Sequence, residues 1–119
     1  MARYVDGFVV PVPKKKLDAY RKMAKMGAKV WKEHGALEYV ECVAEDVKPG
    51  KLTSFPQSVM LKKDETVVFA WIVYKSRKDR DRIMAAAMQD PRFAGMDHAS
   101  MPFDGKRMFW GGFEVMVKA

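Results

Sequence analysis

Cysteine and histidine are scarce in this chain: the sequence has one cysteine, Cys42, and two histidines among 119 residues. A single thiol cannot form a disulfide within the chain, and one cysteine with two histidines cannot complete a four-ligand structural zinc site. A glycine-rich phosphate-binding motif is also missing from the sequence. These absences predict a protein of a reducing compartment that holds no metal and no cofactor.

Long apolar runs are missing too. The longest, Val67–Tyr74, has the length of a strand and falls far short of the ~20 residues that a membrane-spanning helix needs. Arg3 and Asp6 come before any apolar stretch of signal-peptide length. We therefore expect a cytoplasmic protein with no membrane partner. The content of 49% hydrophobic and 12% aromatic residues is typical of a folded chain, and the length predicts one domain over residues 1–119.

The formal net charge of +7 comes from one segment. Residues 13–32 carry eight basic side chains and one acidic one, while the rest of the chain is balanced. Pro11 and Pro13 lie at or just before the start of this segment and Gly35 follows it, which predicts a helix between them. One face of that helix is apolar and should pack on the domain, whereas the opposite face should meet water. Four lysines represent that basic face: Lys22, Lys25, Lys29 and Lys32. An alternative is that they bind nucleic acid.

Hydrophobic and β-branched runs predict four strands and a second helix. The strands are expected at residues 4–12, 37–46, 67–74 and 106–117, and the second helix runs from the Ser76 cap to Gln89. The order β-α-β, β-α-β with right-handed crossovers predicts an α+β, ferredoxin-like fold, in which a four-stranded antiparallel sheet carries two helices on one face. Its first and third strands are then central. Gly111 and Gly112 in the last strand indicate a bulge or a close backbone approach.

Both faces of this sheet are predicted to be apolar. In the third strand, Val67, Phe69, Trp71 and Val73 point one way, while Val68, Ala70, Ile72 and Tyr74 point the other. Helices can cover only one of these faces, so something other than water must cover the second. Because two-fold homodimers are the commonest oligomers, we expect a second copy of the chain, packed sheet against sheet.

Two long connections complete the chain. They span residues 47–66 and 90–105, and loops of such length in a compact domain are often functional or locally helical. The first is predicted to form one short helical turn at Phe55–Met60.

Three stretches resemble a known family. They are Tyr4–Pro13, Val68–Tyr74 and Met101–Met108, of which the last, Met-Pro-Phe-Asp-Gly-Lys-Arg-Met, is the most specific. Together they look like the bacterial YbaA-like family, over essentially the whole chain. The resemblance implies a dimeric α+β barrel, a superfamily in which ligands usually sit between the sheet and the helices of one subunit. The family itself has no settled function.

The superfamily also contains haem-degrading enzymes, but their active-site residues cannot all be matched to this sequence. The resemblance to that branch implies an Asn-Trp-His constellation, whereas this sequence has no asparagine. A haem-degrading activity is therefore not expected from the resemblance.

Three residues are candidate catalytic bases. Asp6 interrupts a predicted central strand, so it is either a buried, partnered carboxylate or a base with a pKa raised by desolvation. His34 lies near the end of the first helix and His98 in the second long loop, and either could act as a general base or serve as an ordinary packed or exposed histidine. Glu41 and Glu114 also interrupt strands, but at predicted sheet edges, and are expected to face water.

Three tryptophans are candidate ligand-binding residues. Trp31 lies on the apolar face of the first helix, and Trp71 and Trp110 lie on strands. They could line an aromatic pocket, although core and dimer packing would explain them equally well.

Three functions remain open from the sequence. The first is a homodimer that binds a small organic molecule in an aromatic pocket, with cofactor-independent proton-transfer or oxygenase chemistry left undecided. The second is a nucleic-acid-binding module that uses the basic helix. The third is a purely structural or interaction protein. The first hypothesis predicts a cavity between sheet and helices that contains Asp6 or a histidine.

Overall fold

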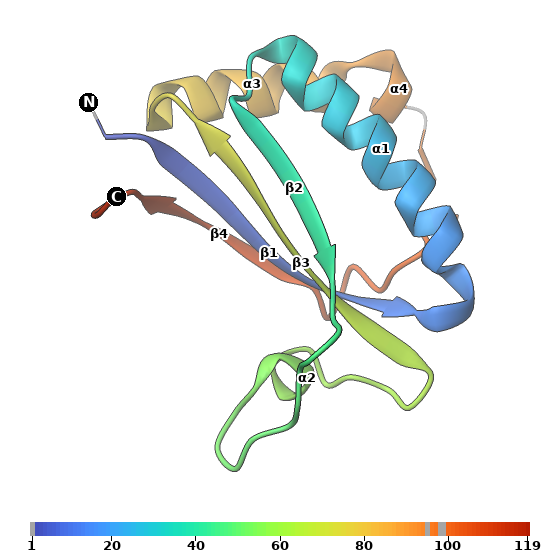
Figure 1. Ribbon diagram of the computed structural model, residues 1–119. Helices are drawn as coiled ribbons and strands as arrows, with labels where there is room; N and C mark the ends of the chain where they lie inside the picture. Colours follow the sequence, from blue (N-terminus) through green and yellow to red (C-terminus); the bar gives the residue numbers. More distant parts are fainter. Residues whose placement is uncertain (1, 95, 98–99) are drawn as a thin grey trace.

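The computed structural model describes residues 2–94, 96–97 and 100–119 (Figure 1). Four antiparallel strands form one sheet in the order β2-β3-β1-β4. Their bounds are Tyr4–Pro13 for β1, Glu38–Val43 for β2, Glu65–Tyr74 for β3 and Phe109–Glu114 for β4. The predicted ferredoxin-like arrangement is confirmed, including the central positions of β1 and β3.

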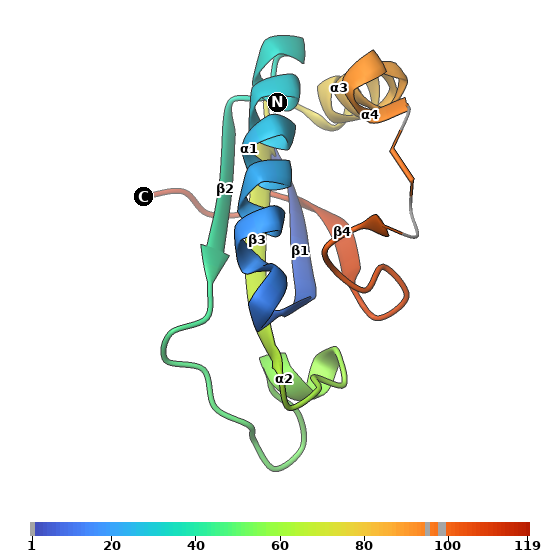
Figure 2. The same cartoon turned by 90° about the vertical axis from the view of Figure 1, so that its right-hand side faces the viewer.

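Two long helices lie on one face of the sheet, as Figures 1 and 2 show. A 3-10 turn, η1 (Lys14–Lys16), leads into α1 (Leu17–His34), and α3 (Arg77–Gln89) lies beside the C-terminal half of α1. Two short helices, α2 (Phe55–Ser58) and α4 (Pro91–Ala94), interrupt the long connections. In the part of the chain that the structure describes, no helix is long and apolar enough to span a membrane.

The predicted helix ends are confirmed by their caps. Gly35 ends α1 with a φ of 120°, and its N–H donates to the Lys32 and Trp31 carbonyls. The Ser76 hydroxyl caps α3 by accepting a 3.2 Å hydrogen bond from the Asp79 N–H. The predicted turn at Phe55 is the helix α2, whereas α4 was not predicted.

The last strand is shorter than the predicted range of residues 106–117. Residues before Phe109 form a turn instead, in which the Asp104 carboxylate accepts a 2.9 Å hydrogen bond from the Lys106 N–H. Glu114 pairs with Tyr4, the first residue of β1, and only one further backbone bond, from the Val115 N–H to the Arg3 carbonyl at 2.9 Å, follows it. The pairing of Gly111 and Gly112 with β1 is regular, without a bulge. Gly112 instead makes room for a side chain, because a β-carbon there would overlap the Tyr4 phenol.

The core lies between the sheet and the helices. Its centre is formed by Val10, Val12, Tyr20 and Val68 at one end and by Ala36, Ile72, Tyr74 and Ile83 at the other. A third, smaller cluster lies on the opposite face, where Val59 from the α2 connection packs on Val9 and Val67.

The rest of that opposite face, here called the open face, is uncovered in the single chain. It presents Phe69, Trp71, Phe109 and Phe113, with exposed fractions of 42% for Phe69, 47% for Phe109 and 65% for Phe113. The prediction that both sheet faces are apolar is therefore correct, and one of them lies under the helices.

Candidate ligand-binding site

A cavity of about 370 Å³ lies between the helices and the sheet. Besides two tyrosines, its aromatic lining consists of Phe8, Trp31, Phe93, Phe103 and Trp110. Five methionines complete most of the apolar wall: Met23, Met84, Met88, Met101 and Met108. Two of the lining residues, Met88 and Trp110, are partly open to solvent, with exposed fractions of 57% and 47%.

The floor of the cavity is one row of residues across all four strands. Glu41 pairs with Ala70, Ala70 with Phe8, and Phe8 with Trp110. With strands about 4.8 Å apart, this row is roughly 14 Å long. The carboxylate of Glu41 lies at one end and the indole of Trp110 at the other. Phe8 and Trp110 stack with their ring centroids 5.9 Å apart.

Glu41 and two tyrosines form the polar part of the wall. The Tyr20 hydroxyl donates a 2.5 Å hydrogen bond to one Glu41 oxygen, and the Tyr39 hydroxyl donates a 2.7 Å bond to the other. Burial, together with the adjacent carboxylate, raises the pKa of both phenols well above the usual 10. Both tyrosines therefore remain protonated donors at physiological pH.

The same three residues separate the cavity from an outer groove of about 250 Å³ between α1 and β2. The groove is lined on its far side by Arg21, Lys25 and Cys42. Tyr20, Tyr39 and Glu41 line both spaces, together with Ala24. The three polar residues therefore form a thin polar partition between an apolar interior and a basic rim.

The segment that closes the cavity near Met101 and Met108 is held by Arg107. Its guanidinium binds the Glu65 carboxylate through two hydrogen bonds of 2.6 and 2.8 Å and Asp104 through a third of 2.8 Å. It also donates to the Val59 and Met60 carbonyls. These bonds lower the pKa of Glu65 and of Asp104 below their usual values. Arg107 thus joins the most specific motif of the sequence to the α2 connection.

Asp6, a predicted catalytic residue, is fully buried, and each of its carboxylate oxygens accepts a hydrogen bond. One oxygen accepts a 2.7 Å bond from Arg80, and the other accepts a 3.0 Å bond from the Tyr74 hydroxyl. The Tyr74 hydroxyl in turn accepts a 3.1 Å bond from the Trp31 indole. Burial raises the pKa of Asp6, while the Tyr74 and Arg80 contacts oppose that rise. Asp6 does not line the cavity. The role that its contacts indicate is to orient the Trp31 indole through the Tyr74 hydroxyl.

Arg80 extends this arrangement to the other end of the floor. Its guanidinium carbon lies 4.9 Å from the centroid of the Tyr4 ring and 5.9 Å from that of Trp110. The Asp6–Arg80 ion pair therefore contacts, directly or through Tyr74, both tryptophans of the cavity.

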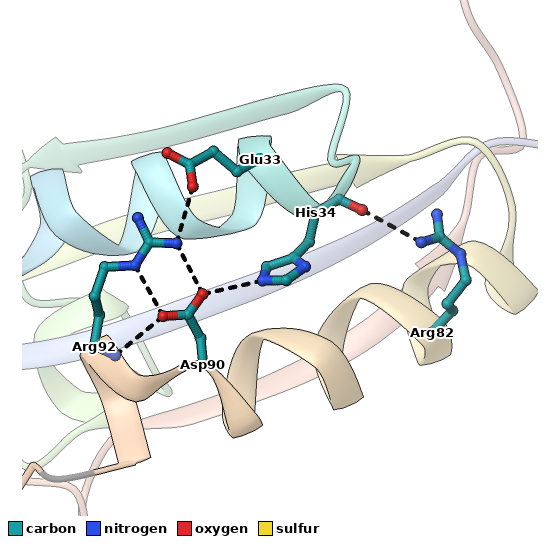
Figure 3. Close-up of polar contacts among 5 residues, drawn as sticks. All are labelled: Glu33, His34, Arg82, Asp90 and Arg92. Atoms are coloured by element: carbon teal, nitrogen blue, oxygen red, sulfur yellow. Dashed lines mark hydrogen bonds and ion pairs between the residues drawn. The ribbon is translucent and has the colours of Figure 1, made fainter.

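His34 also lies outside the cavity lining. Its Nε2 atom lies 3.1 Å from a carboxylate oxygen of Asp90, which also accepts three hydrogen bonds from Arg92 (Figure 3). Arg92 also binds Glu33 at 2.9 Å. These contacts hold the pKa of Asp90 and of Glu33 below their usual range.

The contacts among His34, Asp90 and Arg92 fix the position of α4. They tie α4 to the end of α1, where Phe93 packs edge-on against Trp31 with ring centroids 5.5 Å apart. His34 therefore helps to place one wall of the cavity without facing into it.

The remaining predicted residues lie elsewhere. Trp71 is on the open face, separated by the sheet from Trp31 and Trp110, and its indole donates a 2.9 Å bond to Glu38. His98 lies outside the described residues. Glu114 is exposed at the end of β4. Four lysines are exposed on the outer face of α1, and their role in nucleic-acid binding stays a prediction: Lys22, Lys25, Lys29 and Lys32.

The sequence interpretation missed the polar partition. Glu41 was expected to face water at a sheet edge, but it lies half-buried at the cavity wall. The sequence places Tyr39, Glu41 and Val43 on one face of the strand, because they occupy alternate positions. The other face, with Glu38, Val40 and Cys42, contains a similar mixture of polar and apolar side chains. The pattern alone does not indicate which of these two faces meets the helix.

Comparisons with known proteins agree with the fold and the family expectation. Residues 3–105 match the family described as a protein of unknown function, DUF1428. Proteins named uncharacterized protein YbaA, from Escherichia coli (strain K12) and Shigella flexneri, are each 52% identical over 115 residues, covering 97% of this chain and 97% of theirs. The crystal structure of a dimeric ferredoxin-like protein from an uncultured marine organism is similar over 100% of both chains, with a TM-score of 0.62 and 13% identity.

Proposed function

The chain belongs to the DUF1428 family, whose function is not known, and from its cavity we propose that it binds a small, mainly apolar organic molecule between α1 and the sheet. The observation that carries this proposal is the space itself. Protein interiors are normally packed with few voids larger than a water molecule. A volume of about 370 Å³ falls instead in the range of small-molecule sites.

The lining supports binding more directly than it supports catalysis. Aromatic rings and flexible methionine side chains surround the space and could adapt to a ligand. The candidate bases Asp6 and His34 do not face it. We therefore propose a binding role, and turnover would need a base from the partition of Tyr20, Tyr39 and Glu41.

The proposal is tested with 4-phenyl-1-butanol, a neutral probe shorter than the cavity floor. We expect saturable binding by calorimetry and shifts of the methionine methyl signals in the NMR spectrum. The shifts should be largest for the five cavity methionines and smallest for Met60 and Met116, which are 69% and 92% exposed. Absence of binding at millimolar probe, or shifts concentrated on Met60 and Met116, would overturn the proposal.

A matched pair of variants gives a second test. Ala24 lines the cavity from α1, whereas Ala19 is exposed on the same helix. Ala24→Phe should fill the space and lower the affinity for the probe at least tenfold, and Ala19→Phe should leave it unchanged. Thermal melting of both variants establishes that each is folded.

We also infer that two copies pair through their open faces. Phe69, Phe109 and Phe113 form an exposed apolar surface larger than single scattered residues would make. In the row beside them, Trp71 lies next to Gly7 and Gly111. A β-carbon at Gly7 would meet nothing within 4 Å. The face therefore carries the bulky Trp71 ring beside a strip without side chains, at Gly7 and Gly111. A two-fold axis would place each ring over the other copy's strip. The similar marine protein is described as dimeric.

Cys42 supports a cytoplasmic location for this assembly. Its thiol is free and exposed at the edge of the open face. Such a thiol persists in a reducing compartment and would be open to oxidation elsewhere.

A further inference from the structure

The class of ligand can be narrowed from the charge of the cavity wall. We propose that the site selects a small apolar molecule carrying one protonated amine, with the ammonium group on the Glu41 carboxylate and the apolar body along the floor toward Trp110. This inference rests on the proposed binding function and adds to it the charge and orientation of the ligand.

The first support is the set of partners that Glu41 has. Both of its observed bonds are accepted from tyrosine hydroxyls, one at each oxygen. An ionised carboxylate has about four acceptor positions, so two remain for a ligand. Those positions call for a donor, and an ammonium group supplies up to three.

The second support is the lack of a countercharge. Among the described residues, none of the ion pairs includes Glu41, and no lysine or arginine lines the cavity. The cations that share a space with Glu41 line the outer groove, where the Arg21 guanidinium is bound to Asp18 at 2.7 Å and Lys25 lines the far side. A half-buried carboxylate that faces an apolar space attracts a cation more strongly than it would in water and repels an anion.

The third support is the arrangement of the rings around that charge. Trp31 lies with its ring centroid 6.4 Å from that of Tyr39 and 5.5 Å from that of Phe93. Electron-rich ring faces stabilise a nearby cation, and aromatic walls with a carboxylate are a known chemistry for ammonium groups. The rest of the floor, Ala70, Phe8 and Trp110, offers no polar side chain except the Trp110 N–H. A ligand with one charged end and an apolar body therefore fits the row.

A simpler role for Glu41 is to hold Tyr20 and Tyr39, and with them α1 and β2, together. That role predicts no preference for charged ligands. The experiment has to separate the two roles, and also to separate a failure of this inference from a failure of ligand binding itself.

Three probes with one carbon skeleton achieve this separation: 4-phenylbutylamine, 4-phenyl-1-butanol and 4-phenylbutyrate. For the wild-type protein at pH 7, calorimetry should show the amine binding about tenfold more tightly than the alcohol, since it adds a charge-assisted hydrogen bond. The carboxylate should bind more weakly than the alcohol. The advantage of the amine should shrink as salt is added, because the site is open to solvent.

A matched pair of variants tests the residue. Glu41→Gln should remove the preference for the amine while retaining binding of the alcohol. Glu38→Gln changes the same residue type on the same strand, on the open face, and should keep the preference. Equal affinities for amine and alcohol in the wild-type protein, or an unchanged ratio in Glu41→Gln, would overturn the ammonium proposal while leaving the binding function intact. If none of the three probes binds, the proposed function itself is wrong. The wild-type ratio decides the matter even if Glu41→Gln does not fold.

Discussion

A β-carbon added to Gly27 would lie 2.8 Å from the hydroxyl oxygen of Tyr39. Gly27 is buried in the middle of α1, where glycine is less favourable than alanine by about 1 kcal/mol. This less favourable residue occurs at the position of the helix that faces the Tyr39 phenol of the polar partition. The relationship indicates that the placement of Tyr39 beside Glu41 is specific, and it can be tested directly.

We expect Gly27→Ala to move the Tyr39 hydroxyl away from Glu41. Its effect on the free energy of unfolding should be near zero, because the gain in helix propensity and the loss of the hydrogen bond are both about 1 kcal/mol. In a Tyr39→Phe background the hydroxyl is absent and the next ring atom lies 3.5 Å away, an ordinary contact. The same Gly27→Ala change should then stabilise the protein by about 1 kcal/mol. Denaturant unfolding of the four proteins measures both values, and equal effects in the two backgrounds would contradict the assignment.

The Asp6–Arg80 pair is expected to dominate the stability of the sheet-helix interface. Both side chains are buried, so Asp6→Asn removes the buried countercharge of the Arg80 guanidinium and should cost about 3 kcal/mol. Asp81 provides the control, because it binds the same arginine at 2.8 Å but is 57% exposed. Asp81→Asn should cost less than about 1 kcal/mol. Similar losses from the two variants, measured by denaturant unfolding, would show that burial of the pair is not what matters.

The fold was predictable because its signals are local and strong. The apolar run of β3, the Ser76 cap and Gly35 after α1 each define an element within a few residues, and the chain order then selects one topology. The site was less predictable because its partners are distant. Asp6 meets Arg80 across 74 positions and Tyr74 across 68. No pattern within one element indicates such a contact.

Glu41 illustrates the same limit in a different way. An acidic residue on an edge strand is commonly a solvated one, and only the packing of α1 over β2 turns it toward the cavity. His34 was correctly placed at the end of α1, but its contact with Asp90 depends on the unpredicted helix α4. The tryptophans were identified as a group, and the pleat of the sheet divides them between two faces.

The open face is predicted to make the protein a dimer at micromolar concentration. Light scattering should give about twice the 13.6 kDa mass of the chain. Phe113→Glu places a charge on the open face, where pairing would bury it without a partner, and should give a monomer. Ala85→Glu, on the exposed surface of α3, should remain dimeric. A wild-type protein of monomeric mass at this concentration contradicts the pairing.

The Arg107–Glu65 pair should make stability sensitive to acid. Hydrogen bonds from Arg107 lower the pKa of Glu65 below its usual 4.5 in the folded protein. A carboxylate with a lowered folded-state pKa stabilises the fold fully above the unfolded-state value, and this contribution is lost as the pH falls through the folded-state value. The free energy of unfolding should therefore decline below about pH 4.5. Asp104, whose pKa is lowered by the same arginine, contributes in the same direction.

Glu65→Gln tests whether this pair carries the effect. The side chains of Glu65 and Arg107 are only 5% and 11% exposed, so the variant should be less stable at pH 7 by about 3 kcal/mol. Its unfolding free energy should then fall less steeply between pH 5 and pH 3 than that of the wild-type protein. Asp18→Asn, which removes an ion pair whose carboxylate is 92% exposed, should leave the acid dependence unchanged. Parallel wild-type and Glu65→Gln profiles would mean that the other carboxylates bound by arginine, Glu33 and Asp90 at the α1–α4 junction, carry the acid sensitivity.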